Sequence, residues 1–298
     1  MSQTKVKIRL LVSFLALLLF TPITTVYAAD TGTIGINPAY PRKDNPRSAN
    51  IFIHTIDPTE SKEDGIKIFN YTKEKRTVEI RAVDAAMSVD GSFSCRQDSE
   101  PRKEVGTWVK LEEQRIILNP ESSEVIDFTV TVPKGATPGE HGGCITVQDT
   151  KDFASTSGSG IQLGFRSAIR IAIQVPGKIV KELSILRVER KRLEDGNYSI
   201  SPIAKNTGNV SLDAKTRLQL VDSFGRPSPL KSADYPVMPG ATMGWAFTVE
   251  RPFWGGFYKA QTSISYNADP TAGLGERVND TKKIRKDTGY FFMIGAPE

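Results

Sequence analysis

The stretch LNPESSEVIDFTVTVPKGATPGEHGGCITVQDT, residues 118–150, decides the fold class. Apolar and polar residues alternate from Ile126 to Val132, which is typical of a strand with one buried face. Four Pro and Gly residues between Pro133 and Gly139 then interrupt this strand, and an extended pattern resumes over His141–Gln148. A strand, a Pro/Gly corner and a second strand together indicate one turn of a β-sandwich.

Similar patterns recur on both sides of this stretch, and no segment shows a convincing helical period. Residues 29–50 are rich in Pro, Gly and Asn and are predicted to form an extended lead-in segment. The other strands predicted before Pro176 are Ile51–Ile56, Gly65–Tyr71, Thr77–Asp84, Trp108–Leu111, Gln114–Leu118 and the long alternating run Ile161–Ile173. About eight strands fit one Ig-like β-sandwich over residues 51–176.

A second unit of the same kind is predicted over residues 178–298. Its predicted strands lie around Ile185–Val188 and over Tyr198–Lys205, Thr216–Val221, Gly244–Val249, Phe257–Tyr266 and Tyr290–Ile294, the last returning to pair with this second sheet. Ser223–Pro239 is predicted to be a Pro-rich connection, and the residues after Asn267 a polar tail. The predicted fold class is therefore all-β, with two tandem Ig-like β-sandwich domains after a signal peptide.

The signal peptide is predicted over residues 1–28. Lys5, Lys7 and Arg9 form a basic start, Leu10–Phe20 is an apolar run, and Val26-Tyr27-Ala28 is a small-residue cleavage site. The apolar run is about half the length that a membrane-spanning helix needs. The mature protein is therefore expected outside the cytoplasm, in an extracellular, cell-surface or periplasmic location.

The charge balance does not favour nucleic acid as a partner. The formal net charge of +5 falls to about +2 once the three basic residues of the signal are removed. Acidic and basic residues are also interspersed, as they are between Arg187 and Glu194. We interpret that cluster as a solvated strand or turn, and the alternative is contact with an anionic polymer.

The two cysteines, Cys95 and Cys144, predict a disulfide because the chain is expected to be exported. Ile145 and Val147 share a face of their strand, so the neighbouring Cys144 points the other way. If the two apolar residues are core, the bridge ties the charged excursion, residues Gly91–Thr107, onto the outside of the sheet. The excursion is then the better place to look for a binding surface.

No catalytic, metal or cofactor site is predicted. The chain has no CxxC pair for zinc, no GxSxG nucleophile elbow, and only two histidines, His54 and His141. His141 lies at the sandwich corner, where a side chain that binds local backbone is the simpler interpretation. Acidic residues that could suggest hydrolysis or weak calcium binding are interpreted as solvated loop residues: Glu112, Glu113, Glu121, Glu124, Asp149 and Asp152.

Aromatic residues around Gly255-Gly256 offer a second candidate surface. Trp254, Phe257 and Tyr258 lie with Phe253 in a corner of the second unit that should be exposed. They are either core filling at a corner or a contact surface for a protein or a carbohydrate ring. The same alternatives apply to Tyr290–Met293, for which sheet pairing is the simpler interpretation.

Several motifs of the first unit resemble a known family. They are INPAYP, IKIFNYTKEKRTVEIRAVDA, the Gly-x-Trp segment GTWVKL and VTVPKGATPGEHGGCITVQ. Together they resemble the N-terminal domain of the WxL-interacting cell-surface proteins and their bacterial relatives. The second unit, with NTGNVSL and FFMIG, is similar to the C-terminal Ig-like domain of the same proteins.

The resemblance implies a non-enzymatic surface protein, an adhesion or scaffold component, whose first domain binds peptidoglycan and whose second contacts other surface proteins or a host. Members of this family usually finish with a transmembrane helix and a basic tail, and this sequence stops at Glu298, so the resemblance leaves a membrane tether open. The alternative is a periplasmic chaperone or pilus-assembly factor of two Ig-like domains, which would donate a strand to a client's open sheet. The run Ile161–Ile173 is the strand that such a factor would need.

Overall fold

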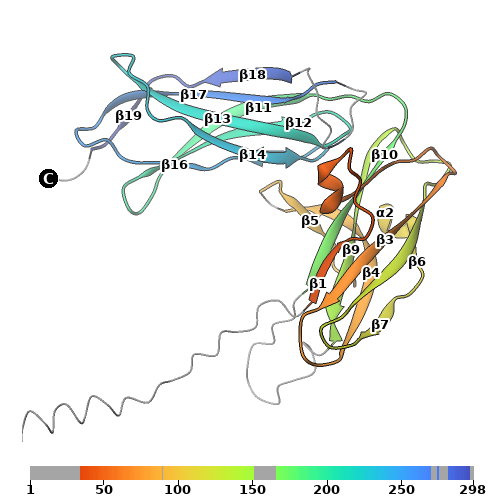
Figure 1. Ribbon diagram of the computed structural model, residues 1–298. Coiled ribbons are helices and arrows are strands. Elements are labelled where there is room, and N and C mark those ends of the chain that lie inside the picture. Colours follow the sequence, from red (N-terminus) through yellow and green to blue (C-terminus); the bar gives the residue numbers. More distant parts are fainter. Residues whose placement is uncertain (1–33, 89, 151–165, 270–273, 275–280, 296–298) are drawn as a thin grey trace, which may run out of the picture. The chain divides into compact units, whose positions relative to one another are not determined.

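The structure is a computed structural model that describes residues 34–88, 90–150, 166–269, 274 and 281–295. These residues form two β-sandwiches, each with two sheets around a hydrophobic core of its own (Figure 1). The predicted all-β class with tandem Ig-like sandwiches is thereby confirmed. The predicted signal peptide, residues 1–28, lies outside the described residues. No helix within the described ranges is long and apolar enough to cross a membrane.

The first sandwich packs a four-stranded sheet against a six-stranded sheet. The smaller sheet is antiparallel and contains, in spatial order, β1 (Ile34–Pro38), β3 (Ser61–Asn70), β8 (Ser123–Thr131) and β6 (Val109–Leu111). The larger contains β2 (Phe52–Thr55), β10 (Arg166–Val175), β9 (Gly139–Asp149), β4 (Arg76–Met87) and β5 (Phe93–Cys95), with β7 (Arg115–Leu118) also paired to β4. Two short helices, η1 (Pro46–Ala49) and α2 (Val105–Trp108), lie between strands.

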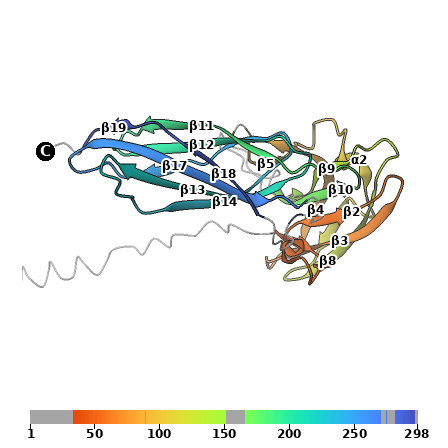
Figure 2. The ribbon, with the colours of Figure 1, turned by 90° about the horizontal axis from the view of Figure 1, so that it is seen from above.

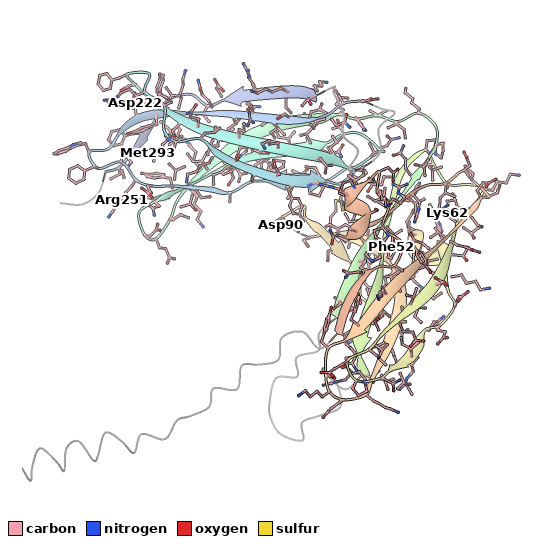
Figure 3. All side chains as sticks on the ribbon, viewed as in Figure 1. Phe52, Lys62, Asp90, Asp222, Arg251 and Met293 are labelled. Atoms are coloured by element: carbon pink, nitrogen blue, oxygen red, sulfur yellow. A yellow bond between two sulfur atoms is a disulfide. The ribbon has the colours of Figure 1, made fainter. Side chains whose placement is uncertain are left out.

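The alternation between residues 126 and 132 sets the core of the first sandwich. Ile126, Phe128, Val130 and Val132 are all buried, and the larger sheet contributes Ile145, Val147 and Phe52 to the same cluster. Phe52 is labelled in Figure 3. The rings of Phe52 and Phe128 meet edge to face, with centroids 4.9 Å apart. Burying one side chain of this size contributes about 1.5–3 kcal/mol, so a period of two decides which face of each strand turns inward.

The second sandwich has two sheets as well, and both are antiparallel (Figure 2). One contains β11 (Leu183–Arg192), β12 (Tyr198–Asn206) and β15 (Thr242–Gly244), with β16 (Phe247–Val249) also paired to β12. The other contains β14 (Lys231–Val237), β13 (Leu212–Asp222), β17 (Gly256–Asn267) and β18 (Thr281–Asp287), with β19 (Phe291–Met293) also paired to β17. The run Tyr290–Ile294 thus returns to the second sandwich, as predicted.

The first sandwich includes part of the segment predicted to lead into it. Within residues 29–50, β1 pairs with β3 from Ile34 opposite Asn70 to Pro38 opposite Ile66. Ile34 and Ile36 also pack against the first core. The sandwich therefore begins before Ile51, because this segment has two apolar residues with the spacing that places both on one face of a strand.

Two strands of the second sandwich lie in segments predicted to be a connection and a tail. β14 falls within Ser223–Pro239, and β18 falls after Asn267. Both are outermost in their sheet and largely exposed. An outer strand buries few side chains, so its sequence lacks a clear apolar period, and pairing with β13 or β17 is what orders it.

Two buried asparagines, each at the end of a strand, hold the turns that follow. The Asn70 side chain donates to the carbonyl oxygens of Glu74 and Asn119, both at 2.8 Å. The Asn206 side chain donates to the carbonyl oxygens of Val210 at 2.8 Å and Val237 at 2.9 Å. Both asparagines thus satisfy loop carbonyl groups that would otherwise be buried without a partner.

Candidate functional site

The charged excursion, residues Gly91–Thr107, is attached to the outer face of the larger sheet of the first sandwich. Cys95 is bonded to Cys144, with their Cα atoms 6.0 Å apart, which confirms the predicted disulfide. Cys144 is fully buried but lies on the face of β9 opposite Ile145 and Val147, and those two residues belong to the core. The bridge therefore holds the excursion outside the core, as its strand position predicts.

A buried carboxylate provides the second attachment. Asp84, 4% exposed at the outer part of β4, accepts hydrogen bonds from the backbone N–H groups of Lys103 (2.5 Å), Glu104 (3.1 Å) and Gly106 (2.8 Å). These N–H groups lie at the start of α2, where a helix leaves donors without an internal partner. A Cβ atom at Gly106 would lie 2.8 Å from the carbonyl carbon of Val83, so a glycine is needed for this close approach.

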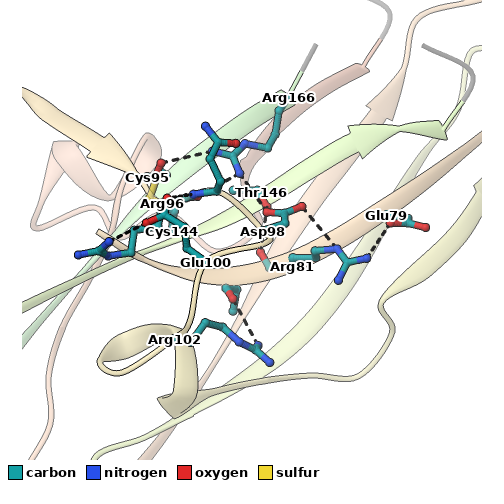
Figure 4. A network of polar contacts seen from close by, with 12 residues as sticks. Glu79, Arg81, Cys95, Arg96, Asp98, Glu100, Arg102, Cys144, Thr146 and Arg166 are labelled. Atoms are coloured by element: carbon teal, nitrogen blue, oxygen red, sulfur yellow. Dashed lines mark hydrogen bonds and ion pairs between the residues drawn. A yellow bond between two sulfur atoms is a disulfide. The ribbon is translucent and has the colours of Figure 1, made fainter. Parts of the chain in front are cut away.

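An ion-pair network crosses the face between these two attachments (Figure 4). The Asp98 carboxylate lies 3.4 Å from Nε of Arg81 and 3.0 Å from Nη1 of Arg166. Arg81 also pairs with Glu79 at 2.9 Å. Arg81 is thus held between two carboxylates, which reduces the number of positions that its long side chain can adopt.

Further contacts stabilise the part of the excursion that follows Cys95. Arg166 donates to the carbonyl oxygens of Cys95 at 3.4 Å and Arg96 at 3.1 Å. Glu100 accepts from the Gln97 backbone N–H at 2.8 Å and pairs with Arg96 at 2.7 Å. The Gln97 N–H and then the Arg96 guanidinium hold the pKa of Glu100 below its ordinary value.

A cleft of about 490 Å³ lies between β4, β6 and the end of the excursion. We call it the polar cleft. Its lining residues are Ile80, Arg81, Ala82, Val83, Asp98, Arg102, Gly106, Thr107, Val109, Lys110, Leu111 and Gln114. Ile80, Val83 and Val109 are buried, whereas Arg81, Arg102 and Lys110 are exposed. The polar cleft therefore has an apolar floor and a cationic rim, with hydrogen-bonding groups on Thr107 and Gln114.

Arg81 and Asp98 also line a neighbouring cleft of about 500 Å³, together with Glu79, Ser99, Gln148 and Thr150. The same ion pair thus forms the wall between the two clefts. Glu79 and Asp98 together hold the Arg81 guanidinium in this wall.

The structure gives His141 the role that its corner position predicts. Its Nε2 donates to the carbonyl oxygen of Thr137 at 2.8 Å, and its Nδ1 lies 3.0 Å from the Glu104 carboxylate. The imidazole ring also packs against Trp108, with centroids 4.7 Å apart. His141 therefore connects the corner to the start of α2.

His54 and Asp149 are likewise engaged in the fold, whereas Glu112, Glu113, Glu121 and Glu124 are exposed. His54 is buried with Asp64, Nε2 to Oδ2 2.7 Å, and Asp149 is buried with Arg76 at 3.2 Å. Asp152 lies outside the described residues. Over the described ranges, no group of three or more His, Cys, Asp or Glu side chains could hold a metal ion.

The aromatic corner of the second sandwich is exposed, as expected from the sequence. Trp254 is 85% exposed and Phe257 55%, whereas Tyr258 is half-buried and packs against the second core. Phe253 lies beside Trp254, with ring centroids 4.8 Å apart. That these side chains contact a partner remains a prediction.

The sequence predicted the excursion as a candidate surface but not the complete polar cleft. Asp98, Arg102 and Thr107 belong to the excursion, whereas Arg81 and Lys110 come from neighbouring strands. The outward position of Arg81 on β4 follows from alternation with Ile80 and Ala82. The sequence around Arg81 does not reveal that its side chain lies beside Asp98, because that contact depends on how the excursion folds back onto the sheet.

The first sandwich is similar to a known protein domain. Residues 35–149 match the family model described as the WxL Interacting Protein, peptidoglycan binding domain. The first sandwich is therefore similar to the domain that this model describes. The WxL-interacting-protein match ends at Asp149, within the strand that carries Cys144, so it includes the disulfide, the excursion and the whole polar cleft. No curated protein sequence matches the chain.

Chaperones are among the solved structures of similar fold. A chain of the chaperone–tip adhesin complex of CFA/I fimbriae is 15% identical, with 85% of this chain and 98% of that chain covered and a TM-score of 0.40. The class 5 fimbriae chaperone CfaA is 13% identical, with 89% and 100% covered and a TM-score of 0.37. The Pseudomonas aeruginosa CupB2 chaperone is 12% identical, with 80% and 97% covered and a TM-score of 0.38. Similarity at this level concerns the fold alone.

Proposed function

We propose that this chain is an exported, non-catalytic protein of the cell envelope and that its first sandwich binds peptidoglycan in the polar cleft. The family of residues 35–149 supports peptidoglycan as the ligand. The position of the site is inferred from one observation: within that domain, Arg81, Arg102 and Lys110 form a cationic rim around an apolar floor.

The chemistry of peptidoglycan suits such a cleft. Its glycan strands present hydroxyl and acetamido groups, and its peptide stems end in carboxylates. A guanidinium group binds a carboxylate through two parallel hydrogen bonds, which Arg81 and Arg102 could each provide. Thr107 and Gln114 offer neutral donors and acceptors for amide or hydroxyl groups.

A binding role also fits the carboxylates of the two clefts. Glycoside hydrolysis commonly uses one protonated and one ionised carboxyl group on either side of the bond that breaks. Glu79 and Asp98 are both paired with Arg81, and Asp98 is paired with Arg166 as well. Both carboxylates therefore serve to hold the Arg81 guanidinium in place.

The position of β10 does not favour the chaperone alternative. The described part of the predicted donor strand is β10, and Ile161, Leu163 and Phe165 lie outside the described residues. β10 is hydrogen-bonded to β9 along its length, and β2 occupies its other edge over Ile171–Gln174. A strand already paired on both sides there has no free edge to offer a client.

The proposal is tested by sedimentation of the mature chain, residues 29–298, with purified peptidoglycan. Arg81→Gln and Arg102→Gln are each expected to weaken binding about tenfold, because each removes a charge-assisted hydrogen bond of about 1.5–3 kcal/mol. Arg81→Gln should leave folding intact, since Asp98 keeps its pair with Arg166.

Arg42→Gln is the matched control, because the Arg42 side chain is 41% exposed, close to the 49% of Arg81, and lies outside the polar cleft. It should bind as the parent does. Parent-like binding by both cleft variants would show that the polar cleft is not the site. Release of soluble sugar fragments during the incubation would contradict a non-catalytic role.

A further inference from the structure

One end of the second sandwich carries an unusual number of exposed aromatic side chains. Phe224 is 82% exposed, Phe253 72%, Trp254 85% and Phe292 56%. They come from the turn after β13, the turn before β17, and β19. Together with Phe257 we call these residues the aromatic end.

The backbone pairing shows that these segments meet. Asp222 pairs with Tyr258, and Tyr258 pairs with Phe291, so the ends of β13, β17 and β19 lie side by side. Figure 3 shows the labelled residues Asp222, Arg251 and Met293 at this same end. Phe257 is directly opposite Phe292, with ring centroids 5.3 Å apart.

The turn that carries Phe253 and Trp254 is built to hold them outward. Gly255 has φ +75° and Gly256 φ +149°, which favour glycine. A Cβ atom at Gly255 would lie 2.9 Å from the carbonyl oxygen of Met293, so the turn is packed against the end of β19. The two side chains cannot fold inward, since buried residues such as Phe291 and Met293 fill the end of the core.

Cationic side chains lie directly beside the exposed rings. The Arg226 guanidinium lies 5.1 Å from the ring centroid of Phe224, and Lys259 Nζ lies 5.8 Å from that of Tyr290. Arg251 precedes the Phe253–Trp254 turn. Acidic groups lie nearby as well: Asp222, paired with Arg226 at 2.8 Å, Glu250, and Asp195 in the hairpin turn beside Arg251. Arg251 and Lys259 thus lie where they could meet anionic groups around the rings.

We propose that the aromatic end inserts into the interfacial region of an anionic lipid bilayer. Phe224, Phe253 and Trp254 project from two separate turns, so a rigid partner would need a separate pocket for each. A bilayer surface adapts to projecting side chains, and it favours an aromatic ring with a cation behind it. Anionic headgroups complement Arg251 and Lys259.

Tryptophan fluorescence reports directly on this contact. The chain has three tryptophans, and Trp254 is exposed, whereas Trp108 and Trp245 are 9% and 5% exposed. Residues 29–298 would be mixed with vesicles of equimolar phosphatidylcholine and phosphatidylglycerol, because the predicted signal peptide would itself enter lipid. The emission is expected to shift to shorter wavelength, and acrylamide quenching of Trp254 should fall. Trp254→Phe should abolish the shift while the protein still sediments with the vesicles.

Replacing both Phe253 and Trp254 by serine is expected to weaken vesicle sedimentation roughly tenfold or more, because two exposed apolar side chains are removed. Tyr71→Ser is the control, since Tyr71 is 62% exposed but lies in the first sandwich, and it should bind as the parent does. Three results would overturn the proposal: no spectral change with these vesicles, parent-like sedimentation of the double serine variant, or capture of a surface protein by the aromatic end without vesicle binding.

Discussion

Replacing Cys95 and Cys144 together by alanine is expected to lower the free energy of unfolding by about 4 kcal/mol. The bridge joins residues 49 positions apart, and opening a loop of that length restores conformational entropy to the unfolded chain. Alanine is chosen because Cys144 is fully buried, where a serine hydroxyl would need a partner. Urea unfolding of residues 29–298 measures the change.

The matched control is the parent protein in reductant, which should lose a similar amount, while reductant should leave the alanine variant unchanged. Equal stability of the parent with and without reductant would contradict the prediction. Because Cys95 holds the excursion beside Arg81, the double variant should also bind peptidoglycan more weakly than its fraction of folded protein explains. Sedimentation well below the unfolding midpoint separates these two effects.

The second large effect is expected from Asp84→Asn, at about 3 kcal/mol of lost stability. The buried Asp84 carboxylate accepts from the N–H groups of Lys103, Glu104 and Gly106. An asparagine keeps only one acceptor oxygen, and its NH₂ group would face backbone donors. Each hydrogen bond to a charged group is worth about 1.5–3 kcal/mol, and leaving a buried donor unpaired adds a cost.

Urea unfolding measures this loss, and amide hydrogen exchange locates it, since the N–H groups of Lys103, Glu104 and Gly106 should exchange faster. Asp90→Asn is the control. Asp90 is an exposed aspartate just before the excursion, so its replacement should change stability by only about 0.5 kcal/mol. If these three amides exchange at the same rate in Asp84→Asn as in the parent, Asp84 does not hold the end of the excursion against the sheet.

Local alternation predicted the inner strands because their side chains are sorted by burial. β8 and β9 each contribute one apolar face to the same core, and the position of Cys144 next to Ile145 placed the disulfide on the outer face. The outer strands β14 and β18 were missed, because they bury little and depend on β13 and β17 for hydrogen bonds.

The candidate site was predicted in part for a similar reason. The excursion stood out as a charged interruption between strands, and its cysteine showed where it is attached. From the sequence, Arg81 and Asp84 could be recognised only as strand residues. Their partners Asp98 and Lys103 lie in the part of the excursion that follows Cys95. Such contacts depend on the path that the excursion takes in the folded protein, and its amino-acid composition does not reveal that path.

By itself the sequence determined the all-β class and the outward side of Cys144, because each follows from periodicity or from residues adjacent in the chain. It predicted the disulfide only from the expected export of the chain, and the structure shows that Cys95 and Cys144 are paired. Only the tertiary structure decided that Asp84 binds the backbone at the end of the excursion and that Arg81 lies between Glu79 and Asp98. It also decided that the polar cleft opens beside them. These features depend on distances between side chains from separate strands, and such distances exist only once the hydrophobic core has brought those strands together.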